Sequence, residues 1–291
     1  MVDIAIIGSG PAALSAAINC RQRNKTVQVL GRSIDSSLLF AAEKVDNYLG
    51  IPDVDGEELL NRFHKHAIAS GVVFRECRVT QILFMGDKYV INAENEFIEA
   101  KALILALGLS KSKGIAGETE YLGKGVSYCA TCDGMLYRGK KVVVVSENEE
   151  GESEANFLAD ICAEVIYVPM YKNITYTKNN VFIKEGKPKA VLGESGRVTS
   201  LQLENELLAC DGIFFAKNSV PPESLLFGLE MDGKNIAIDR RMQTNLPCVF
   251  AAGDCTGTPY QIAKAVGEGL IAGLSAAAAV DQLDRDKNRY K

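Results

Sequence analysis

Short runs of hydrophobic residues, each closed by a glycine or a polar turn, recur along the chain. Continuous apolar runs of this length are typical of strands buried on both faces of a parallel sheet. The clearest of them occupy residues 2–7, 27–30, 101–108 and 140–145. Residues 14–23 lie between the first two runs and have the composition of a helix. The chain is therefore predicted to begin with a strand, a turn, a helix and a second strand.

The second half of the chain has a weaker pattern of short strands and polar turns. Such strands are expected at residues 165–168, 181–184, 201–203 and 212–215. Residues 248–254 form one more apolar run, and a long helix rich in alanine and glycine follows it. We interpret the fold as α/β, with two doubly wound, Rossmann-like nucleotide-binding domains, the second inserted in the first. Residues 1–111 and 243–291 are assigned to the first domain, and residues 112–242 to the insert.

The turn after the first strand, residues 8–13, has the sequence Gly-Ser-Gly-Pro-Ala-Ala. Its two glycines let the chain turn tightly and let backbone N–H groups approach a pyrophosphate, and Ala13 lets the helix pack close to the sheet. The apolar run near the other end of the chain closes with Gly253 and Asp254. An aspartate in this place suits a hydroxyl-rich ligand such as a ribityl chain. Both ends of the chain therefore predict a nucleotide cofactor of the flavin type.

Cys129 and Cys132 are separated by two residues, a spacing at which two thiols can close a disulfide and open it again. Asp133 follows directly and can hand a proton to the leaving thiolate. A zinc site would need two further ligands, and the sequence has no second pair of this spacing and no histidine nearby. The other six cysteines are scattered among apolar or small residues and are expected to be buried free thiols. A redox-active pair is therefore predicted, and no metal site.

Composition argues against several classes of function. The chain has 291 residues, of which 47% are hydrophobic and 24% charged, and its net charge of −5 favours neither nucleic acid nor an anionic membrane. The two histidines, His64 and His66, are too few for a histidine-rich metal site. The first apolar run ends at Gly8 with no basic segment before it, and the apolar run 276–280 ends at Asp281. Neither run is expected to be a signal peptide or a membrane span, so we expect a cytoplasmic protein.

Four motifs together resemble the low-molecular-weight thioredoxin reductases, a family of flavoproteins, over nearly the whole chain. They lie at residues 8–12 (Gly-Ser-Gly-Pro-Ala), 45–50 (Val-Asp-Asn-Tyr-Leu-Gly), 125–133 (Gly-Val-Ser-Tyr-Cys-Ala-Thr-Cys-Asp) and 251–254 (Ala-Ala-Gly-Asp). The resemblance implies a homodimer with two doubly wound domains and one FAD in each subunit. It also implies that Cys132 is the thiol nearest the flavin, that Cys129 attacks the disulfide of the partner, and that Asp133 is the acid and base.

The same resemblance implies which residues bind FAD. They come from the first glycine turn, from scattered positions between residues 32 and 108, and from the Gly-Asp motif with the start of the last helix. The implied set is Gly8, Ser9, Gly10, Pro11, Ala12, Ala13, Arg32, Leu39, Asn47, Val79, Gly108, Gly253, Asp254, Gln261, Ile262 and Ala263.

The chain departs from that family where a nicotinamide cofactor should dock. NADPH-dependent members of the family should carry a turn of the type Gly-Gly-Gly-x-Ser-Ala after the strand that matches residues 142–145. Residues 146–151 of this chain are instead Ser-Glu-Asn-Glu-Glu-Gly. Two like charges about 4 Å apart repel by about 4 kcal/mol at an effective dielectric constant of about 20, so these glutamates disfavour a pyrophosphate. The His-Arg-Arg run that holds the 2′-phosphate in the family is also missing, since residues 165–173 contain no arginine. The loss of both parts predicts that NAD(P)H is not used.

A dithiol flavoprotein with no nicotinamide site needs another electron source. The chain also resembles a group that is reduced by ferredoxin, the ferredoxin-dependent flavin thioredoxin reductases. This resemblance implies that electrons pass from reduced ferredoxin through FAD and the Cys129–Cys132 dithiol to thioredoxin. Ferredoxins are acidic, so a basic docking face is expected. Cationic residues near the redox motif that could form this face, or could be ordinary surface charges, are Lys111, Lys113, Lys124, Arg138, Lys140 and Lys141.

Three other interpretations stay open at the level of the sequence. The protein could be an NADPH-dependent thioredoxin reductase with an unusual cofactor loop. It could be a non-catalytic flavin-binding redox regulator, although the intact residues Cys129, Cys132 and Asp133 argue against that class. It could also reduce a different small disulfide or a partner in a peroxide-reducing system, which the sequence does not separate from thioredoxin.

Overall fold

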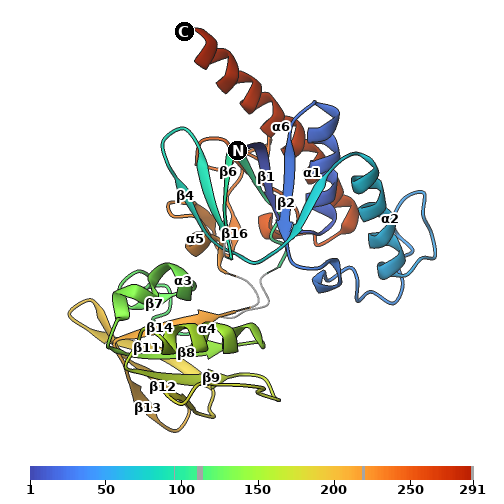
Figure 1. The fold of residues 1–291 in the computed structure, drawn as a ribbon. Coiled ribbons are helices and arrows are strands. Elements are labelled where there is room, and N and C mark those ends of the chain that lie inside the picture. The colour runs from blue at the N-terminus through green and yellow to red at the C-terminus, as the bar shows by residue number, and fades with distance from the viewer. Residues whose placement is uncertain (95, 110–113, 218–219, 290–291) are drawn as a thin grey trace. The chain divides into compact units, whose positions relative to one another are not determined.

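A computed structural model describes residues 1–94, 96–109, 114–217 and 220–289 of the chain. It divides the chain into two compact units (Figure 1). Unit 1 consists of Met1–Ser110 and Pro221–Lys291, and unit 2 consists of Lys111–Val220. Unit 2 is thus inserted between the two segments of unit 1. The predicted α/β fold class, with one nucleotide-binding fold inserted in another, is confirmed.

The sheet of unit 1 has seven strands and is largely parallel. The strands follow in the order β3-β2-β1-β6-β5-β4, and β17 pairs with β6 in addition. The strands with parallel pairing are β1 (Val2–Ile7), β2 (Val27–Gly31), β3 (Val73–Glu76), β6 (Glu96–Leu105) and β17 (Val249–Ala251). β1 lies in the middle, and the exposed fraction of Ile4, Ala5 and Ile6 is 0%. An apolar run without alternation is what a strand covered on both faces requires.

The strands β4 (Val79–Phe84) and β5 (Tyr89–Ala93) extend the same sheet with antiparallel pairing. β6 is long enough to serve both parts of the sheet, because its first half pairs with β5 and its second half pairs with β1 and β17. This hairpin was not predicted from the sequence, since neither β4 nor β5 alternates clearly between buried and exposed side chains.

Helices cover the parallel strands of unit 1. They are α1 (Pro11–Gln22), α2 (Gly56–Ala69) and α6 (Ile262–Arg289), with the short helix α5 (Pro222–Leu225) beside β4. α1 and α6 pack closely because glycine in α6 faces alanine in α1. A Cβ atom on Gly269 would lie 2.2 Å from the backbone oxygen of Ala12, and one on Gly273 would lie 2.7 Å from that of Ala16. Small side chains at this contact therefore hold α1, which starts from the glycine turn, in its place.

Among the described residues, α6 is the one helix whose length and composition would allow it to cross a membrane (Ile262–Lys287, mean hydropathy 1.3). Its apolar side has partners in the protein, because Ala272, Ala276 and Val280 have an exposed fraction of 0% and belong to the core of unit 1. Of the apolar stretch of this helix, 33% is buried inside the protein. The helix continues past Asp281, where the apolar run of the sequence ends.

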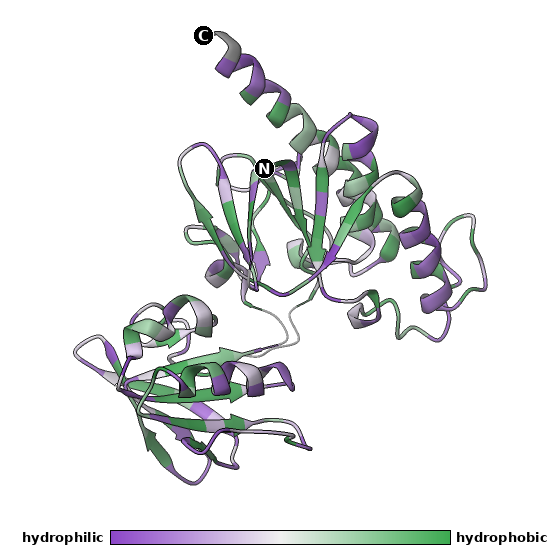
Figure 2. Cartoon of the chain, viewed as in Figure 1, coloured by the Kyte–Doolittle hydropathy of each residue, from purple (hydrophilic) through white to green (hydrophobic). Residues whose placement is uncertain are grey.

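Unit 2 has a parallel sheet with the strand order β10-β9-β8-β14-β7. Its strands are β7 (Val126–Ser127), β8 (Lys141–Ser146), β9 (Glu164–Pro169), β10 (Val181–Ile183) and β14 (Gly212–Ala216). Its helical segments are α3 (Ala130–Asp133), the 3-10 helix η2 (Gly134–Tyr137) and α4 (Glu150–Ala159). A separate antiparallel sheet contains β11 (Pro188–Glu194), β12 (Arg197–Leu203) and β13 (Leu207–Ala209). The central strands of both units are hydrophobic, as Figure 2 shows.

Several boundaries differ from the sequence prediction. α1 begins at Pro11 rather than at residue 14, because proline suits the first helical position, where its missing N–H is not needed. The turn after β8 is short, since α4 already begins at Glu150. The crossings between the units lie at 110/111 and 220/221 rather than at 111/112 and 242/243. The segment after the second crossing stays with unit 1 because α5 packs on β4, and because the hairpin of β15 (Met231–Asp232) and β16 (Asn235–Ile236) packs on the 3-10 helix η3 (Asp254–Thr256).

Candidate functional site

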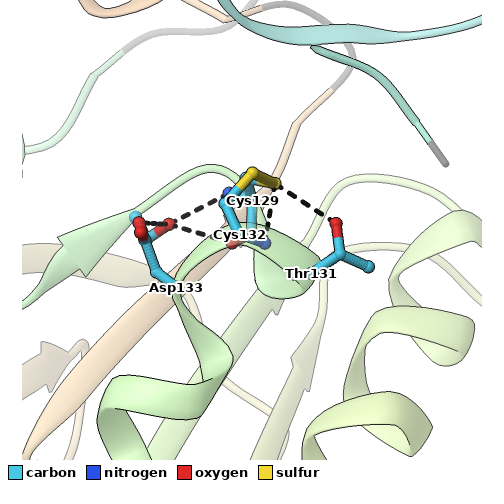
Figure 3. The surroundings of a disulfide bond; sticks show 5 residues. Cys129, Thr131, Cys132 and Asp133 are labelled. Carbon is cyan, nitrogen blue, oxygen red and sulfur yellow. Dashed lines mark hydrogen bonds between the residues drawn. A yellow bond between two sulfur atoms is a disulfide. The ribbon is translucent and has the colours of Figure 1, made fainter. Parts of the chain in front are cut away.

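The predicted dithiol lies in unit 2, at the start of the short helix α3, and is closed as a disulfide (Figure 3). The two Cα atoms are 5.3 Å apart. Cys129 caps α3, and its Sγ accepts a hydrogen bond from the backbone N–H of Cys132 at 3.2 Å. The hydroxyl oxygen of Thr131 lies 3.4 Å from the same sulfur. Two donors are therefore placed to stabilise a thiolate on Cys129 once the disulfide opens.

Asp133 is held beside the dithiol by Ser127, a residue to which the sequence analysis gave no role. The buried hydroxyl of Ser127 donates to Oδ2 of Asp133 at 2.7 Å and accepts from the backbone N–H of Cys129 at 3.0 Å. Ser127 ends β7, so this strand fixes the carboxylate and the first cysteine relative to each other. The serine was visible in the Gly-Val-Ser motif, but its function depends on a contact that only the folded chain makes.

Replacing Ser127 by alanine should slow reduction of a disulfide substrate about tenfold while the Cys129–Cys132 disulfide still forms. Asp133 then loses the hydrogen bond that aims it, and a hydrogen bond to a charged group contributes about 1.5–3 kcal/mol. Rates measured between pH 5 and 9 should also show a shifted acid limb, which a purely structural defect would not produce. The variant Ser127→Thr keeps the hydroxyl and should recover most of the rate. Equal losses in both variants would contradict the positioning role.

A buried ion pair lies beside the residue that precedes the dithiol. Nζ of Lys217 lies 2.6 Å from Oε1 of Glu118, and the two side chains are 4% and 1% exposed. Tyr128, which precedes Cys129, donates its hydroxyl to the same carboxylate oxygen at 2.5 Å. Removing one partner of a buried pair leaves an uncompensated charge, which is strongly destabilising. The pair therefore keeps the residue next to the dithiol in one position.

In unit 1, the predicted residues Gly8, Arg32, Gly108 and Gly253 follow the carboxyl ends of β1, β2, β6 and β17. These strands are parallel, so their carboxyl ends meet at one edge of the sheet. Gly8 has a φ of +120°, and a Cβ atom there would lie 2.1 Å from the carbonyl oxygen of Ala106, so only glycine fits. Gly31, at the end of β2, packs on the same turn, since a Cβ atom there would lie 3.1 Å from the backbone nitrogen of Ser9. Gly31 was not among the predicted residues because it lies outside the glycine motif. The fold itself thus requires this tight turn.

Gly10 has a different reason to be glycine. Its φ is −82°, which any residue adopts, and the nearest atom to a Cβ there would be the hydroxyl oxygen of Ser37 at 4.0 Å. The described part of the fold leaves room for a side chain in front of α1. A glycine at a helix N-terminus that the fold does not need suits the close approach of a pyrophosphate.

Asp254 is a second indication of a ligand. Its side chain is partly buried, and its carboxylate has no hydrogen-bond partner in the part of the chain that the structure describes. Burial raises the pKa of Asp254, and the positive charge of Lys264 opposes this shift. The loop is fixed from one side, because Glu268 accepts from the N–H of Gly253 at 2.8 Å and Lys264 donates to the carbonyl oxygen of Gly253 at 2.9 Å. A rigid loop therefore presents an acceptor to a hydroxyl-rich ligand.

The fold also joins predicted cofactor residues that are far apart in the sequence. Nδ2 of Asn47 donates to Oε1 of Gln261 at 3.0 Å, and the hydroxyl of Ser9 donates to the carbonyl oxygen of Arg32 at 2.8 Å. Of the other predicted positions, Pro11, Ala12 and Ala13 start α1, Ile262 and Ala263 start α6, Leu39 and Val79 are buried, and Gly108 follows β6. Together with the open space at Gly10 and the unpaired carboxylate of Asp254, these residues fit FAD.

The turn between β8 and α4, where a second nucleotide would dock, is closed by its own hydrogen bonds. The backbone N–H of Glu147 donates to a carbonyl oxygen of β14 at 3.0 Å, and that of Asn148 donates to Oγ of Ser146 at 3.3 Å. The N–H of Glu150 donates to Oδ1 of Asn148 at 3.1 Å, and that of Gly151 donates to the carbonyl oxygen of Asn148 at 3.3 Å. These amides, which in a doubly wound fold face a pyrophosphate, already have acceptors.

The cationic residues around the dithiol are only partly covered by the structure. Lys111 and Lys113 lie outside the described residues. Lys141 pairs with Glu164 at 2.6 Å. The exposed members of the set are Lys124, Arg138 and Lys140.

The remaining cysteines and histidines show no further site. Five of the six free cysteines are buried, and Cys248 is partly exposed. His64 packs on Phe74, with the ring centroids 4.4 Å apart. In the described ranges, no group of three or more His, Cys, Asp or Glu side chains is arranged to hold a metal ion.

Known proteins share this architecture. Residues 2–269 match the family model described as pyridine nucleotide-disulphide oxidoreductase. The chain is 31% identical to a thioredoxin reductase from Helicobacter pylori, over 97% of this chain and 99% of that protein. It is similar to the solved structure of a ferredoxin-flavin thioredoxin reductase from Clostridium acetobutylicum, with 43% identity, a TM-score of 0.87 and 98% of both chains covered. It is also similar to that of an atypical thioredoxin reductase from Desulfovibrio vulgaris Hildenborough, with 30% identity, a TM-score of 0.75, and 97% of this chain and 99% of that chain covered.

Proposed function

The chain belongs to the pyridine nucleotide-disulphide oxidoreductase family, as a flavoprotein disulfide reductase of the thioredoxin reductase type, and from this premise we propose that ferredoxin rather than NAD(P)H supplies its electrons. The proposed path runs from reduced ferredoxin through FAD and the Cys129–Cys132 pair to thioredoxin. The observation that carries the proposal is the turn of residues 146–151, in which the backbone N–H groups of four residues donate to acceptors within the protein. The similarity to the ferredoxin-flavin thioredoxin reductase from Clostridium acetobutylicum supports it.

We propose that the predicted set of residues in unit 1 binds FAD. Gly10 and the N-terminus of α1 would receive the pyrophosphate, Asp254 would accept from a hydroxyl group, and the Asn47–Gln261 pair would line the same site. Bound there, FAD would accept electrons singly and deliver them in pairs. This is needed because ferredoxin gives one electron at a time and a disulfide takes two.

The chemistry at the dithiol follows from its hydrogen bonds. Two electrons and two protons convert the Cys129–Cys132 disulfide to two thiols. The Cys129 thiolate, stabilised by the N–H of Cys132 and the hydroxyl of Thr131, then attacks the disulfide of thioredoxin. The thioredoxin sulfur that this attack displaces takes a proton, for which Asp133 is the placed acid. Cys132 finally attacks Sγ of Cys129, which releases the second thioredoxin thiol and restores the internal disulfide.

We also propose that the protein acts as a homodimer in the cytoplasm and that acidic ferredoxin binds a basic surface near the dithiol. The exposed side chains of Lys124, Arg138 and Lys140 lie in the segment that flanks residues 129–133 and support such a surface. Opposite charge on the two partners would speed their encounter and orient the donor.

Anaerobic reduction of the purified flavoprotein tests the proposed donor. We expect the flavin absorbance band to stay unchanged with NADPH and with NADH, and to bleach when reduced ferredoxin is added. A thioredoxin reductase that uses NADPH serves as the positive control for the nicotinamide. Rapid bleaching by NADPH would show instead a nicotinamide-dependent reductase with an unusual cofactor loop. Bleaching by ferredoxin without turnover of thioredoxin would favour a different disulfide substrate or a redox regulator.

A further inference from the structure

One carboxylate of α4, that of Glu152, accepts hydrogen bonds from four donor groups inside unit 2. The residue is 7% exposed. Oε1 accepts from the hydroxyl of Tyr171 at 2.8 Å, and Oε2 accepts from the hydroxyl of Thr175 at 2.6 Å. The backbone N–H groups of Thr175 and Tyr176 donate to the same carboxylate at 3.1 and 3.0 Å. Residues 171–176 thus surround an anion that belongs to the protein itself.

These donors follow β9, the second strand of the doubly wound pattern in unit 2. In folds of this type the end of the second strand faces the ribose of a bound dinucleotide, and the turn after the first strand faces its pyrophosphate. Hydroxyl groups and consecutive backbone N–H groups are also the donors that proteins offer to phosphate. Glu152 therefore takes donors that a ribose phosphate would need.

The space between α4 and the end of β9 is filled by side chains. The hydroxyl oxygens of Tyr167 and Tyr171 are 2.8 Å apart. A Cβ atom on Gly151 would lie 2.1 Å from Oγ of Ser146 and 3.1 Å from the hydroxyl oxygen of Tyr167. Close packing of this kind leaves no room for a nucleotide unless the side chains rearrange.

Glu152 is an anion at neutral pH. Burial alone would raise the pKa of Glu152, but the hydrogen bonds from Thr175, Tyr176 and Tyr171 outweigh it and hold the pKa at about 2. A phosphate that approached residues 171–176 would find the donors occupied and would meet a fixed negative charge. The occupied donors and the negative charge both disfavour the binding of a phosphate.

We propose that Glu152 helps to exclude nicotinamide dinucleotides from unit 2, because its carboxylate occupies the N–H and O–H groups of residues 171–176 that would bind a ribose phosphate. The proposal rests on the proposed function, in which ferredoxin replaces NAD(P)H. It assigns to Glu152 the exclusion of the ribose phosphate from the donors after β9. Removing the carboxylate should create an anion site at these donors. It should not by itself create NADPH oxidation, because the turn of residues 146–151 stays closed.

Binding of 2′,5′-ADP, a fragment that carries the 2′-phosphate, to the FAD-loaded chain tests this. Calorimetry should show at least tenfold tighter binding to Glu152→Ala than to the wild-type chain, and the largest NMR shifts should fall on the amides of Thr175 and Tyr176. Glu185→Ala removes one exposed negative charge from the same unit and should bind no better than wild type. Equal gains in both variants would reduce the effect to net charge and overturn the proposal. A folded Glu152→Ala chain without any gain would overturn it too.

Glu152→Gln keeps the proposal testable if the alanine variant does not fold. Glutamine has nearly the same shape but no charge, so it holds the donors less strongly. Protection of the Thr175 and Tyr176 amides against hydrogen exchange should fall at least tenfold, while amides of β8 keep their protection. Unchanged protection at Thr175 and Tyr176 would mean that the carboxylate does not hold the segment.

The pH dependence of stability gives an independent measurement on the same variant. The folded pKa of about 2 lies below the ordinary value of 4.5, so ionised Glu152 stabilises the fold above about pH 4.5, and this contribution is lost as the pH falls toward 2. The difference in Tm between wild type and Glu152→Gln should be constant above about pH 5 and shrink below pH 4.5. A difference that stays the same down to pH 3 would contradict the role of the charge.

Failure of this proposal can be told apart from failure of the proposed function. If NADPH bleaches the flavin of the wild-type chain, the proposed donor is wrong whatever Glu152 does. If the wild-type chain refuses NADPH but Glu152→Ala gains no affinity for 2′,5′-ADP, the proposed function stands and Glu152 is not the excluding residue.

Discussion

Replacement of Cys132 by serine should lower the rate of the proposed ferredoxin-driven reduction of thioredoxin by about three orders of magnitude or more, while FAD stays bound. The reaction needs two sulfurs that close and open one bond, and serine cannot form it. The hydrogen bonds of Ser127 to Asp133 and Cys129 do not involve the Cys132 side chain, so the rest of the site should keep its shape. Turnover of thioredoxin under anaerobic conditions and the FAD content of the purified variant are the two measurements.

The reciprocal variant Cys129→Ser separates the roles of the two sulfurs. Both variants should lose turnover, but only Cys132→Ser should form a stable mixed disulfide with oxidised thioredoxin, because Cys129 can still attack and no thiol is left to resolve the adduct. Intact-protein mass measurement detects the adduct. Cys248→Ser, which changes a partly exposed free thiol, should behave as wild type. An adduct on Cys129→Ser instead would reverse the assigned roles, and retained turnover in Cys132→Ser would exclude the mechanism.

The features that could be predicted from the sequence are those whose chemistry is local. The spacing of Cys129 and Cys132 sets both sulfurs on one turn of α3, so the disulfide seen in the structure follows from four consecutive residues. The strands β1, β2 and β8 could be found because burial on both faces demands an unbroken apolar run. The unusual turn of residues 146–151 was also visible, since it replaces glycines by charged side chains.

Contacts between distant segments could not be predicted in this way. Ser127 and Glu152 look like ordinary polar residues in the sequence, and each acquires a role only when another segment folds against it. The pairing of Asn47 with Gln261 joins residues 214 positions apart. The second crossing between the units was misplaced because the sequence near residue 221 does not indicate that α5 packs on β4. The local sequence pattern thus located the reactive groups. Tertiary contacts determine how these groups are oriented and which ligands are excluded.

Replacement of Gly10 by alanine should lower the affinity for FAD by about two orders of magnitude or more without preventing folding. A Cβ atom at this position meets no described atom nearer than the hydroxyl oxygen of Ser37 at 4.0 Å, and the φ of −82° is open to alanine. The same methyl group would stand between the first N–H groups of α1 and a pyrophosphate. Loss of about two charge-assisted hydrogen bonds, each about 1.5–3 kcal/mol, corresponds to a factor of about 10² to 10⁴ in Kd. Titration of the apoprotein with FAD measures it.

Two matched glycine variants show whether the loss belongs to the ligand or to the fold. Gly86→Ala also places a methyl group in open space, at a φ of +88°, but in the turn between β4 and β5, so it should lower Tm slightly and leave FAD affinity unchanged. Gly8→Ala should disrupt the fold of unit 1, because the Cβ atom of the alanine would lie 2.1 Å from the carbonyl oxygen of Ala106. If Gly10→Ala bound FAD as tightly as wild type, no phosphate would approach the N-terminus of α1. Only a selective loss at Gly10 would mean that this glycine is kept for the cofactor, as Gly8 is kept for the fold.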